Sequence, residues 1–180
     1  MKTYPVATTA LLLLCACPVF AGTYGLGEAI AVKDVKHTDP HRGTTLLKDA
    51  TLTFESVEEH ASIENQLLTT DTHVIKPVNG KFLVVRYSVK NNSDQVLDSW
   101  PLFFGGASLE DDKGNSYPIS KVSGQFAQSA KLDMQGKRMN PGEGISSCVV
   151  FDVPEGSAAG SLTLDLIDAK VSLAGGEAKR

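Results

Sequence analysis

The segment that most constrains the fold of this chain spans residues 80–94, GKFLVVRYSVKNNSD. It predicts a long β-strand that ends in an Asn-rich turn, because Asn tolerates the backbone conformations that turns require. Side chains alternate between the two faces of a strand. One face here is apolar throughout, with Leu83, Val85, Tyr87 and Val89. Phe82 and Val84 make the first half of the opposite face apolar too, so we expect that half to be covered.

Further strands are expected along the rest of the chain, separated by turns rich in Gly, Pro and Asn. They cover residues 27–35, 51–55, 109–118, 145–153 and 162–166. The 109–118 segment should be a hairpin, because its centre is the turn-forming sequence DDKGN. Many short strands between such turns predict an all-β sandwich or barrel. The expected core consists of Leu52, Phe54, Leu83, Val85, Tyr87, Val89, Leu109, Val149, Phe151, Val153, Leu162, Leu164 and Leu166.

Four segments do not show a clear strand pattern. Residues 58–68 and 123–134 have apolar spacings that would also suit a short helix. Residues 37–48 and 65–79 are expected to be long connections. Long connections in compact domains are often functional, so we expect any recognition surface there first.

Residues 1–21 predict an export signal. Lys2 supplies the positive start, an apolar stretch follows, and Val19-Phe20-Ala21 fits a cleavage site. An alternative is lipoprotein processing, because Leu14-Cys15-Ala16-Cys17 resembles a lipobox. Cys17 would then carry a lipid that tethers the protein to a membrane. Both alternatives predict an exported protein, periplasmic or extracellular.

The sequence after residue 21 predicts a single domain over residues 22–172 and a flexible tail over 173–180. The formal charge of −4 becomes −5 when Lys2 is lost with the signal. The charges are scattered, without the basic stripe that nucleic acid binding needs, so we expect no nucleic acid partner. Cys148 is the single cysteine after residue 21, so no intramolecular disulfide can form and apolar burial must hold the fold.

Four motifs in a fixed order resemble a known family. They are the strand end Val89–Ser93, the hairpin Leu109–Tyr117, the turn Asn140–Glu143 and the strand end Val150–Pro154. Together they resemble bacterial exported domains of unknown function related to the mycobacterial immunoprotective extracellular antigen, sometimes labelled telomeric repeat-binding factors. The resemblance covers residues 50–167. It implies an immunoglobulin-like β-sandwich of about seven to nine antiparallel strands and brings no catalytic residues.

The candidate metal site is His37-Thr38-Asp39-Pro40-His41. The imidazoles of His37 and His41 and the carboxylate of Asp39 are ligands that suit zinc or copper. A third imidazole would have to come from His60 or His73. The alternative is two exposed loop histidines and no cofactor.

A second candidate is the aromatic cluster of Trp100, Phe103 and Phe104. It could be an exposed patch for a partner or glycan, or a loop that caps the core, because aromatic side chains contribute strongly to burial. Asn91-Asn92-Ser93 matches a glycosylation sequon, but Asn at a strand end already has a role in the turn.

Signatures of catalysis are absent from the sequence. It has no Gly-x-Ser-x-Gly, no His-Glu-x-x-His and no phosphate-cradling glycine loop. We therefore expect a non-catalytic binding or cell-envelope interaction module whose partner is an unidentified envelope or extracellular protein. The alternative is a periplasmic zinc- or copper-binding protein that uses the His37–His41 loop. Membrane contact is expected only if Cys17 is lipidated.

Overall fold

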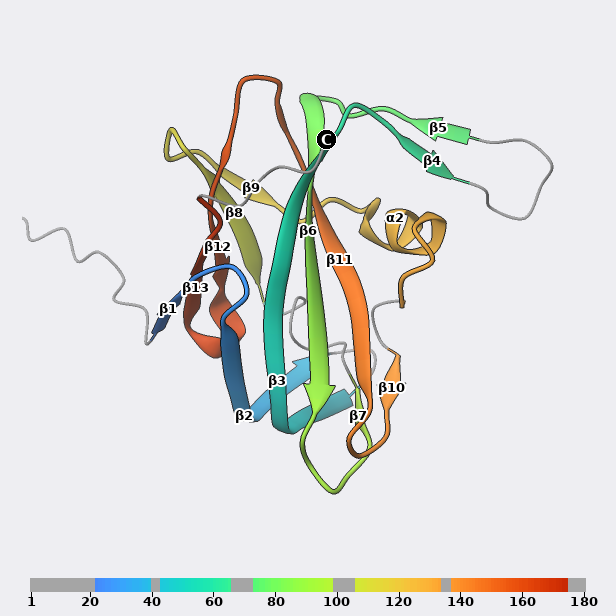
Figure 1. The fold of residues 1–180 in the computed structure, drawn as a ribbon, viewed down its shortest axis with the longest axis vertical. Coiled ribbons are helices and arrows are strands. Elements are labelled where there is room, and N and C mark those ends of the chain that lie inside the picture. Colours follow the sequence, from blue (N-terminus) through green and yellow to red (C-terminus); the bar gives the residue numbers. More distant parts are fainter. Residues whose placement is uncertain (1–21, 40–42, 66–72, 99–105, 134–136, 175–180) are drawn as a thin grey trace, which may run out of the picture.

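The computed structural model describes residues 22–39, 43–65, 73–98, 106–133 and 137–174. Two β-sheets lie face to face, with one short helix on the outside of the sheet that has the longer strands (Figure 1). The export signal predicted at 1–21, including Cys17, lies outside the described residues. In the described part of the chain, no helix has the length and apolar character needed to cross a membrane.

The first sheet is antiparallel and has the strand order β11-β6-β3-β2. Its strands are β2 (Ala29–Asp39), β3 (Gly43–His60), β6 (Gly80–Asn91) and β11 (Gly144–Pro154). The strand predicted from residues 80–94 is therefore β6, at the centre of this sheet. The late strand predicted over 145–153 is β11, which pairs with β6 along its whole length from Gly144↔Lys90 to Pro154↔Gly80.

The second sheet has the order β1-β13-β12-β8-β9. Its strands are β1 (Gly22–Tyr24), β8 (Ala107–Asp111), β9 (Ser116–Pro118), β12 (Ala159–Leu164) and β13 (Ala169–Ser172). Its pairs are antiparallel except β1 with β13, which is parallel. Two short pairs complete the strands: β4 (Ile63–Asn65) with β5 (His73–Ile75), and β7 (Leu97–Asp98) with β10 (Arg138–Met139).

The core between the sheets is formed largely by the residues that alternation predicted. All the predicted core residues from Leu52 to Leu164 are buried. Leu166 is the exception, because β12 ends at Leu164 and the chain enters a 3₁₀ turn, η1 (Asp165–Ile167). Asp168 follows in the left-handed conformation and leads into β13. The prediction for Leu166 was therefore wrong: the chain turns before its side chain could continue the alternation, and it is only half-buried.

The outer face of the first sheet carries a second, smaller apolar cluster, as predicted from Phe82 and Val84. Helix α2 (Ser123–Ser129) packs on this face with Phe126 and Ala127. The helix also protects the edge of β11, because the Ser123 hydroxyl accepts the Val150 N–H at 3.0 Å. Of the two ambiguous segments, 123–134 thus contains a helix, whereas residues 58–60 and 63–65 of the other lie in β3 and β4.

The expected long connection at 37–48 is wrong in its described part. Residues of β2 and β3 pair there as a hairpin, with His37 opposite Thr45 and Asp39 opposite Gly43. This arm extends beyond the last pair that β3 makes with β6, Ala50↔Asn91. The two strands of this arm are held by their pairing with each other. They therefore do not need the apolar alternation that is found in strands that cover a core. The 65–79 segment likewise includes β5, although its residues 66–72 lie outside the described ones.

Asn91 is fully buried at the end of β6. Its amide donates hydrogen bonds to the carbonyl oxygens of Gln95 and Met139, at 2.7 and 3.0 Å. Its side-chain oxygen accepts from the N–H and the hydroxyl of Ser93, at 2.9 and 2.8 Å. The side chain is therefore a structural bracket for the turn predicted at this strand end. It acts through these hydrogen bonds, whereas the prediction rests on the backbone conformations that Asn tolerates.

The predicted hairpin at 109–118 is present as β8 and β9. At its tip Asp111 is buried and accepts hydrogen bonds from Asn115, Tyr117 and Ser157. Burial alone would raise the pKa of this carboxyl, but these donors outweigh it and hold the pKa far below its usual range. Since Ser157 lies in the β11–β12 turn, Asp111 joins two turns at one end of the sandwich.

Candidate functional site

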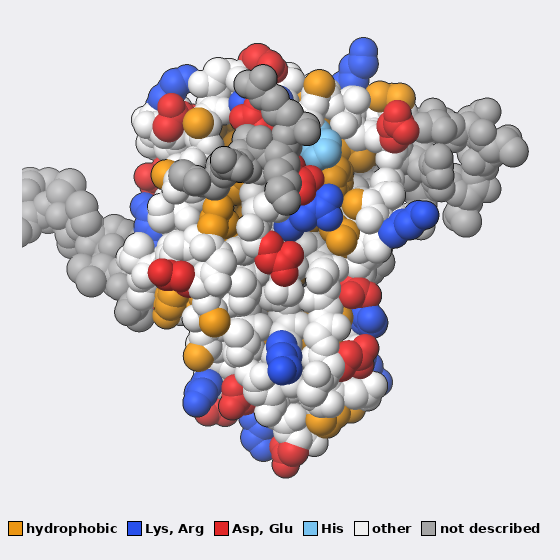
Figure 2. Space-filling view, in the orientation of Figure 1, with side chains coloured by type: hydrophobic (Ala, Val, Ile, Leu, Met, Phe, Trp, Pro, Cys, Tyr) orange, Lys and Arg blue, Asp and Glu red, His pale blue; other side chains and the backbone are white. Residues whose placement is uncertain are grey.

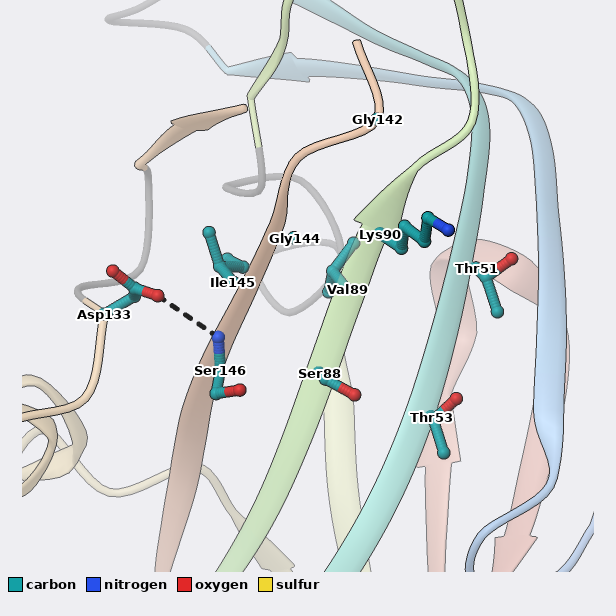
Figure 3. Close-up of a pocket in the computed structure, with 10 residues that line it drawn as sticks. All are labelled: Thr51, Thr53, Ser88, Val89, Lys90, Asp133, Gly142, Gly144, Ile145 and Ser146. Atoms are coloured by element: carbon teal, nitrogen blue, oxygen red, sulfur yellow. Dashed lines mark hydrogen bonds between the residues drawn. The ribbon is translucent and has the colours of Figure 1, made fainter. Parts of the chain in front are cut away.

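The candidate site is a groove on the outer face of the first sheet, beside the area that α2 covers, and Figure 3 shows its lining residues. Its volume is about 430 Å³. Strands β3, β6 and β11 form the floor, and the turn before β11 forms one end. The lining residues are Thr51, Thr53, Ser88, Val89, Lys90, Asp133, Gly142, Gly144, Ile145 and Ser146. We call this feature the hydroxyl groove.

Strand register aligns the polar side chains of the hydroxyl groove in two rows. In the first row Ser88 of β6 lies opposite both Thr53 of β3 and Ser146 of β11. In the second row Lys90 lies between Thr51 and Gly144. Neighbouring strands are about 4.8 Å apart, so three hydroxyl-bearing residues stand at regular intervals across the sheet.

Most of these groups have unused hydrogen-bonding capacity. The Thr51 hydroxyl accepts from the side-chain amide of Asn92 at 2.8 Å. Within the described residues, the hydroxyls of Thr53, Ser88 and Ser146 make no hydrogen bond. Lys90 is exposed, and no carboxylate of the described chain lies within ion-pair distance of its ammonium. The groove thus offers hydroxyls and one positive charge to solvent or to a ligand.

Asp133 at the rim is, by contrast, fully engaged. Its carboxylate accepts from Lys137 Nζ at 2.8 Å and from the Ser146 N–H at 3.2 Å, and its own N–H donates to the Ser146 carbonyl at 2.8 Å. The hydrogen bond from Lys137 lowers the pKa of Asp133, against a smaller opposing effect of burial. Asp133 therefore covers the edge of β11, and its carboxylate is already paired with Lys137.

The end of the groove is shaped by the predicted turn at Asn140–Glu143. Gly142 has a φ of 78°, a left-handed conformation that favours glycine. The Glu143 carboxylate accepts from the Asn140 N–H at 3.0 Å, and this bond is the main reason that the pKa of Glu143 is lowered. Gly142 and Gly144 leave this end of the groove without side chains.

A charged cluster marks the boundary between the groove and the area under α2. Arg86 donates from Nε to Glu58 Oε1 at 2.5 Å and from Nη2 to Oε2 at 3.2 Å, and His60 Nε2 lies 3.3 Å from the same Oε2. Burial raises the pKa of Glu58, but Arg86 and His60 together lower it below its usual value. A bulge between Phe54 and Ser56 shifts the alternation of β3, so that Glu58 faces outwards beside Arg86.

Cys148 lies under α2, opposite Arg86 on the neighbouring strand. Its thiol is fully buried, and burial raises its pKa to about 12. A thiol needs its thiolate form to act as a nucleophile. Cys148 is therefore an inert packing residue, as free buried cysteines usually are.

The site residues predicted from sequence fall largely outside the described part of the chain. The backbone of His37 and Asp39 lies in β2, whereas His41 is beyond the described residues. Trp100, Phe103, Phe104 and Cys17 are also beyond them. Among the described side chains, no group of three or more His, Cys, Asp or Glu is placed to hold a metal ion. The zinc or copper site and the aromatic surface therefore stay predictions.

The hydroxyl groove itself was missed by sequence reasoning. The alternation showed that Arg86, Ser88 and Lys90 point away from the core. It did not show that Thr53 and Ser146 flank Ser88, because that requires the register of three strands that are distant in sequence. The signal that could have indicated it is the choice of small hydroxyl residues at all three positions.

The two packed sheets, their antiparallel strands and the apolar core define an immunoglobulin-like β-sandwich, which confirms the predicted fold class. The family model "Domain of unknown function (DUF4352)" matches residues 44–173. That match spans most of the chain, so this protein belongs to the family of domains with that description.

Two solved structures have a similar fold. One is the secreted protein MPT63 from Mycobacterium tuberculosis, with 13% sequence identity and a TM-score of 0.50 over 83% of this chain and 90% of that chain. The other is an uncharacterised β-sandwich protein from Clostridium difficile 630, with 12% identity and a TM-score of 0.50 over 83% and 92%. No curated protein matches the chain. The family match and the fold of MPT63 agree with the predicted family of exported domains. At these identities the likeness to MPT63 concerns the fold alone.

Proposed function

We propose that this protein is an exported, non-catalytic immunoglobulin-like domain that binds a component of the cell envelope or its surroundings through the hydroxyl groove. The observation that carries the proposal is the set of three aligned hydroxyls, Thr53, Ser88 and Ser146, whose hydrogen-bonding capacity the described chain leaves unused. Small-ligand sites are typically concave and have a few polar groups that orient the ligand. Figure 2 shows an area without charged or hydrophobic side chains across the middle of this face, with charged side chains around and below it.

Two further observations favour export and binding over catalysis. Residues 1–21 have the pattern of an export signal, and one protein of similar fold is described as secreted. The lining of the hydroxyl groove contains no histidine, and its carboxylate, Asp133, is held by Lys137 and Ser146. Nothing in this lining would activate Ser88 or Ser146 as a nucleophile, because a serine needs an adjacent base.

The test is retention of envelope material by the immobilised exported protein, compared with two variants. Ser88→Arg places a long side chain at the centre of the groove. Ser116→Arg is the matched control, because Ser116 is exposed on β9 of the other sheet. We expect the wild type and Ser116→Arg to retain the same components and Ser88→Arg to lose them, with all three giving the same circular dichroism. Equal retention by Ser88→Arg would reject the groove as the binding site.

A further inference from the structure

We infer that the hydroxyl groove binds an acidic oligosaccharide, with a carboxylate of the sugar at Lys90 and sugar hydroxyls along the row of Thr53, Ser88 and Ser146. This inference rests on the proposed function and names the chemical class of its ligand. Three properties of the groove carry it: the kind of hydrogen-bonding group, the sign of the available charge and the dimensions.

The side-chain hydroxyls of the groove match the hydrogen-bonding groups of a sugar better than those of a peptide. Each serine or threonine hydroxyl is one donor and also an acceptor, which is the capacity of a sugar hydroxyl as well. An extended peptide would instead need a row of unsatisfied backbone groups at a strand edge. The groove lies on a sheet face, where Ser88 is in a strand paired on both sides, and the edge at Ser146 is already bonded to Asp133. Side-chain hydroxyls are therefore the groups that would hold the ligand.

The available charge is positive. Lys90 is the one cation in the lining, and it has no ion-pair partner in the described chain, whereas Asp133 is paired with Lys137, which also lies 3.6 Å from Glu143 at the rim. A ligand with an acidic group would thus gain a charge-assisted hydrogen bond that a neutral sugar lacks. A phosphate monoester carries about −1.5 to −2 charges at pH 7 and would face a single ammonium here. One carboxylate therefore fits the charge of this groove more closely.

The dimensions suit a short saccharide. The volume of about 430 Å³ lies in the usual range of small-ligand sites, about 300–1,000 Å³. The first row crosses two strand spacings, so Thr53 and Ser146 are roughly 10 Å apart. That distance is enough for contacts with more than one sugar ring. Gly142 and Gly144 leave space where the saccharide would continue beyond Lys90.

The experiment is a titration of the isotope-labelled exported protein, followed by amide chemical shifts in NMR. The probes are an oligomer of galacturonate, a neutral oligomer of glucose with the same number of units, and inositol phosphate. We expect galacturonate to shift the amides of Ser88, Lys90 and Ser146. In Lys90→Gln its Kd should rise about tenfold, the equivalent of about 1.4 kcal/mol from one charge-assisted bond. Lys121→Gln, which removes an exposed charge away from the groove, should leave the Kd unchanged.

Several outcomes would overturn the inference. Equal affinity for the neutral oligomer, or an unchanged Kd in Lys90→Gln, would remove the role of the charge. Inositol phosphate binding in the groove without galacturonate binding would replace the carboxylate by a phosphate ligand. If no probe shifts the groove amides but Ser88→Arg still loses envelope material, this inference fails and the proposed function stands. If that loss is also missing, both fail.

Discussion

The outer face of the first sheet has two halves that share strands but differ in their partners. In one half, Phe82, Val84 and Cys148 are buried in the cluster on which α2 packs, and Figure 1 shows α2 beside the upper part of β11. In the other half, Ser88, Lys90 and Ser146 line an open groove. Within a few residues along β6 and β11, the side chains on this face thus change from buried and apolar to polar and accessible to solvent. The kind of side chain on one face of a strand therefore indicates whether that part of the face is covered. The ion pair of Arg86 and Glu58 lies at the boundary.

The largest difference between the halves should appear in stability. Phe82→Ala removes a buried ring from the contact with α2 and should lower the free energy of unfolding by about 3–5 kcal/mol, because it leaves a cavity. Urea denaturation measures this value. A loss below about 0.5 kcal/mol, the size of an ordinary surface substitution, would show that α2 does not cover that half of the face.

Adding zinc or copper tests the predicted metal site, which lies outside both halves of this face. If His37, Asp39 and His41 bind zinc or copper, the metal at 100 times its Kd should stabilise the protein by about 2.7 kcal/mol. The groove amides should be unaffected. Thermal unfolding with and without zinc or copper measures the effect, and His37→Ala should abolish it. Unchanged unfolding of the wild type would end the metal hypothesis.

The boundary cluster should give a smaller and pH-dependent effect. Glu58→Gln removes the negative charge that pairs with Arg86 and one of the two oxygens that accept its hydrogen bonds, and should cost about 1–3 kcal/mol near neutral pH. The folded pKa of Glu58 is lowered from 4.5, so the stability that it contributes is present above about pH 4.5 and is lost as the pH falls towards the folded value.

Urea unfolding of the wild type and Glu58→Gln across this pH range checks the sign. The difference between the two proteins should shrink as the pH is lowered below about 4.5. Glu110→Gln is the control, because the side chain of Glu110 is about half exposed and pairs with Lys170 at 3.5 Å. A difference for Glu58→Gln that stays constant with pH would contradict the assignment.

The smallest effect is expected in the open half. Ser88→Ala removes a hydroxyl that has no partner in the described chain, so it should change stability by no more than about 0.5 kcal/mol. The same substitution should weaken binding of the galacturonate oligomer. A clear loss of stability would mean that the Ser88 hydroxyl is used inside the fold rather than offered to a ligand.

The fold could be predicted where one face of a strand meets the core. The alternation of β6 and β11 identified both strands and nearly all their buried residues. It failed where pairing alone makes a strand, as in the arm of β2 and β3, and for β13, which is only four residues long and pairs with β1 from the other end of the chain. The hydroxyl groove could not be predicted for a related reason. Its three aligned residues come from β3, β6 and β11, and a single sequence does not reveal how distant strands align.

The bracket formed by Asn91 has a practical consequence for producing this protein in a eukaryotic secretory host. Asn91-Asn92-Ser93 would be recognised there as an acceptor for an N-linked sugar, yet the amide nitrogen that would receive it is sealed between Gln95 and Met139 in the finished domain. Modification and folding therefore compete for the same nitrogen. Each nascent chain either closes the turn first and stays unmodified, or gains a glycan on the nitrogen that these two hydrogen bonds require.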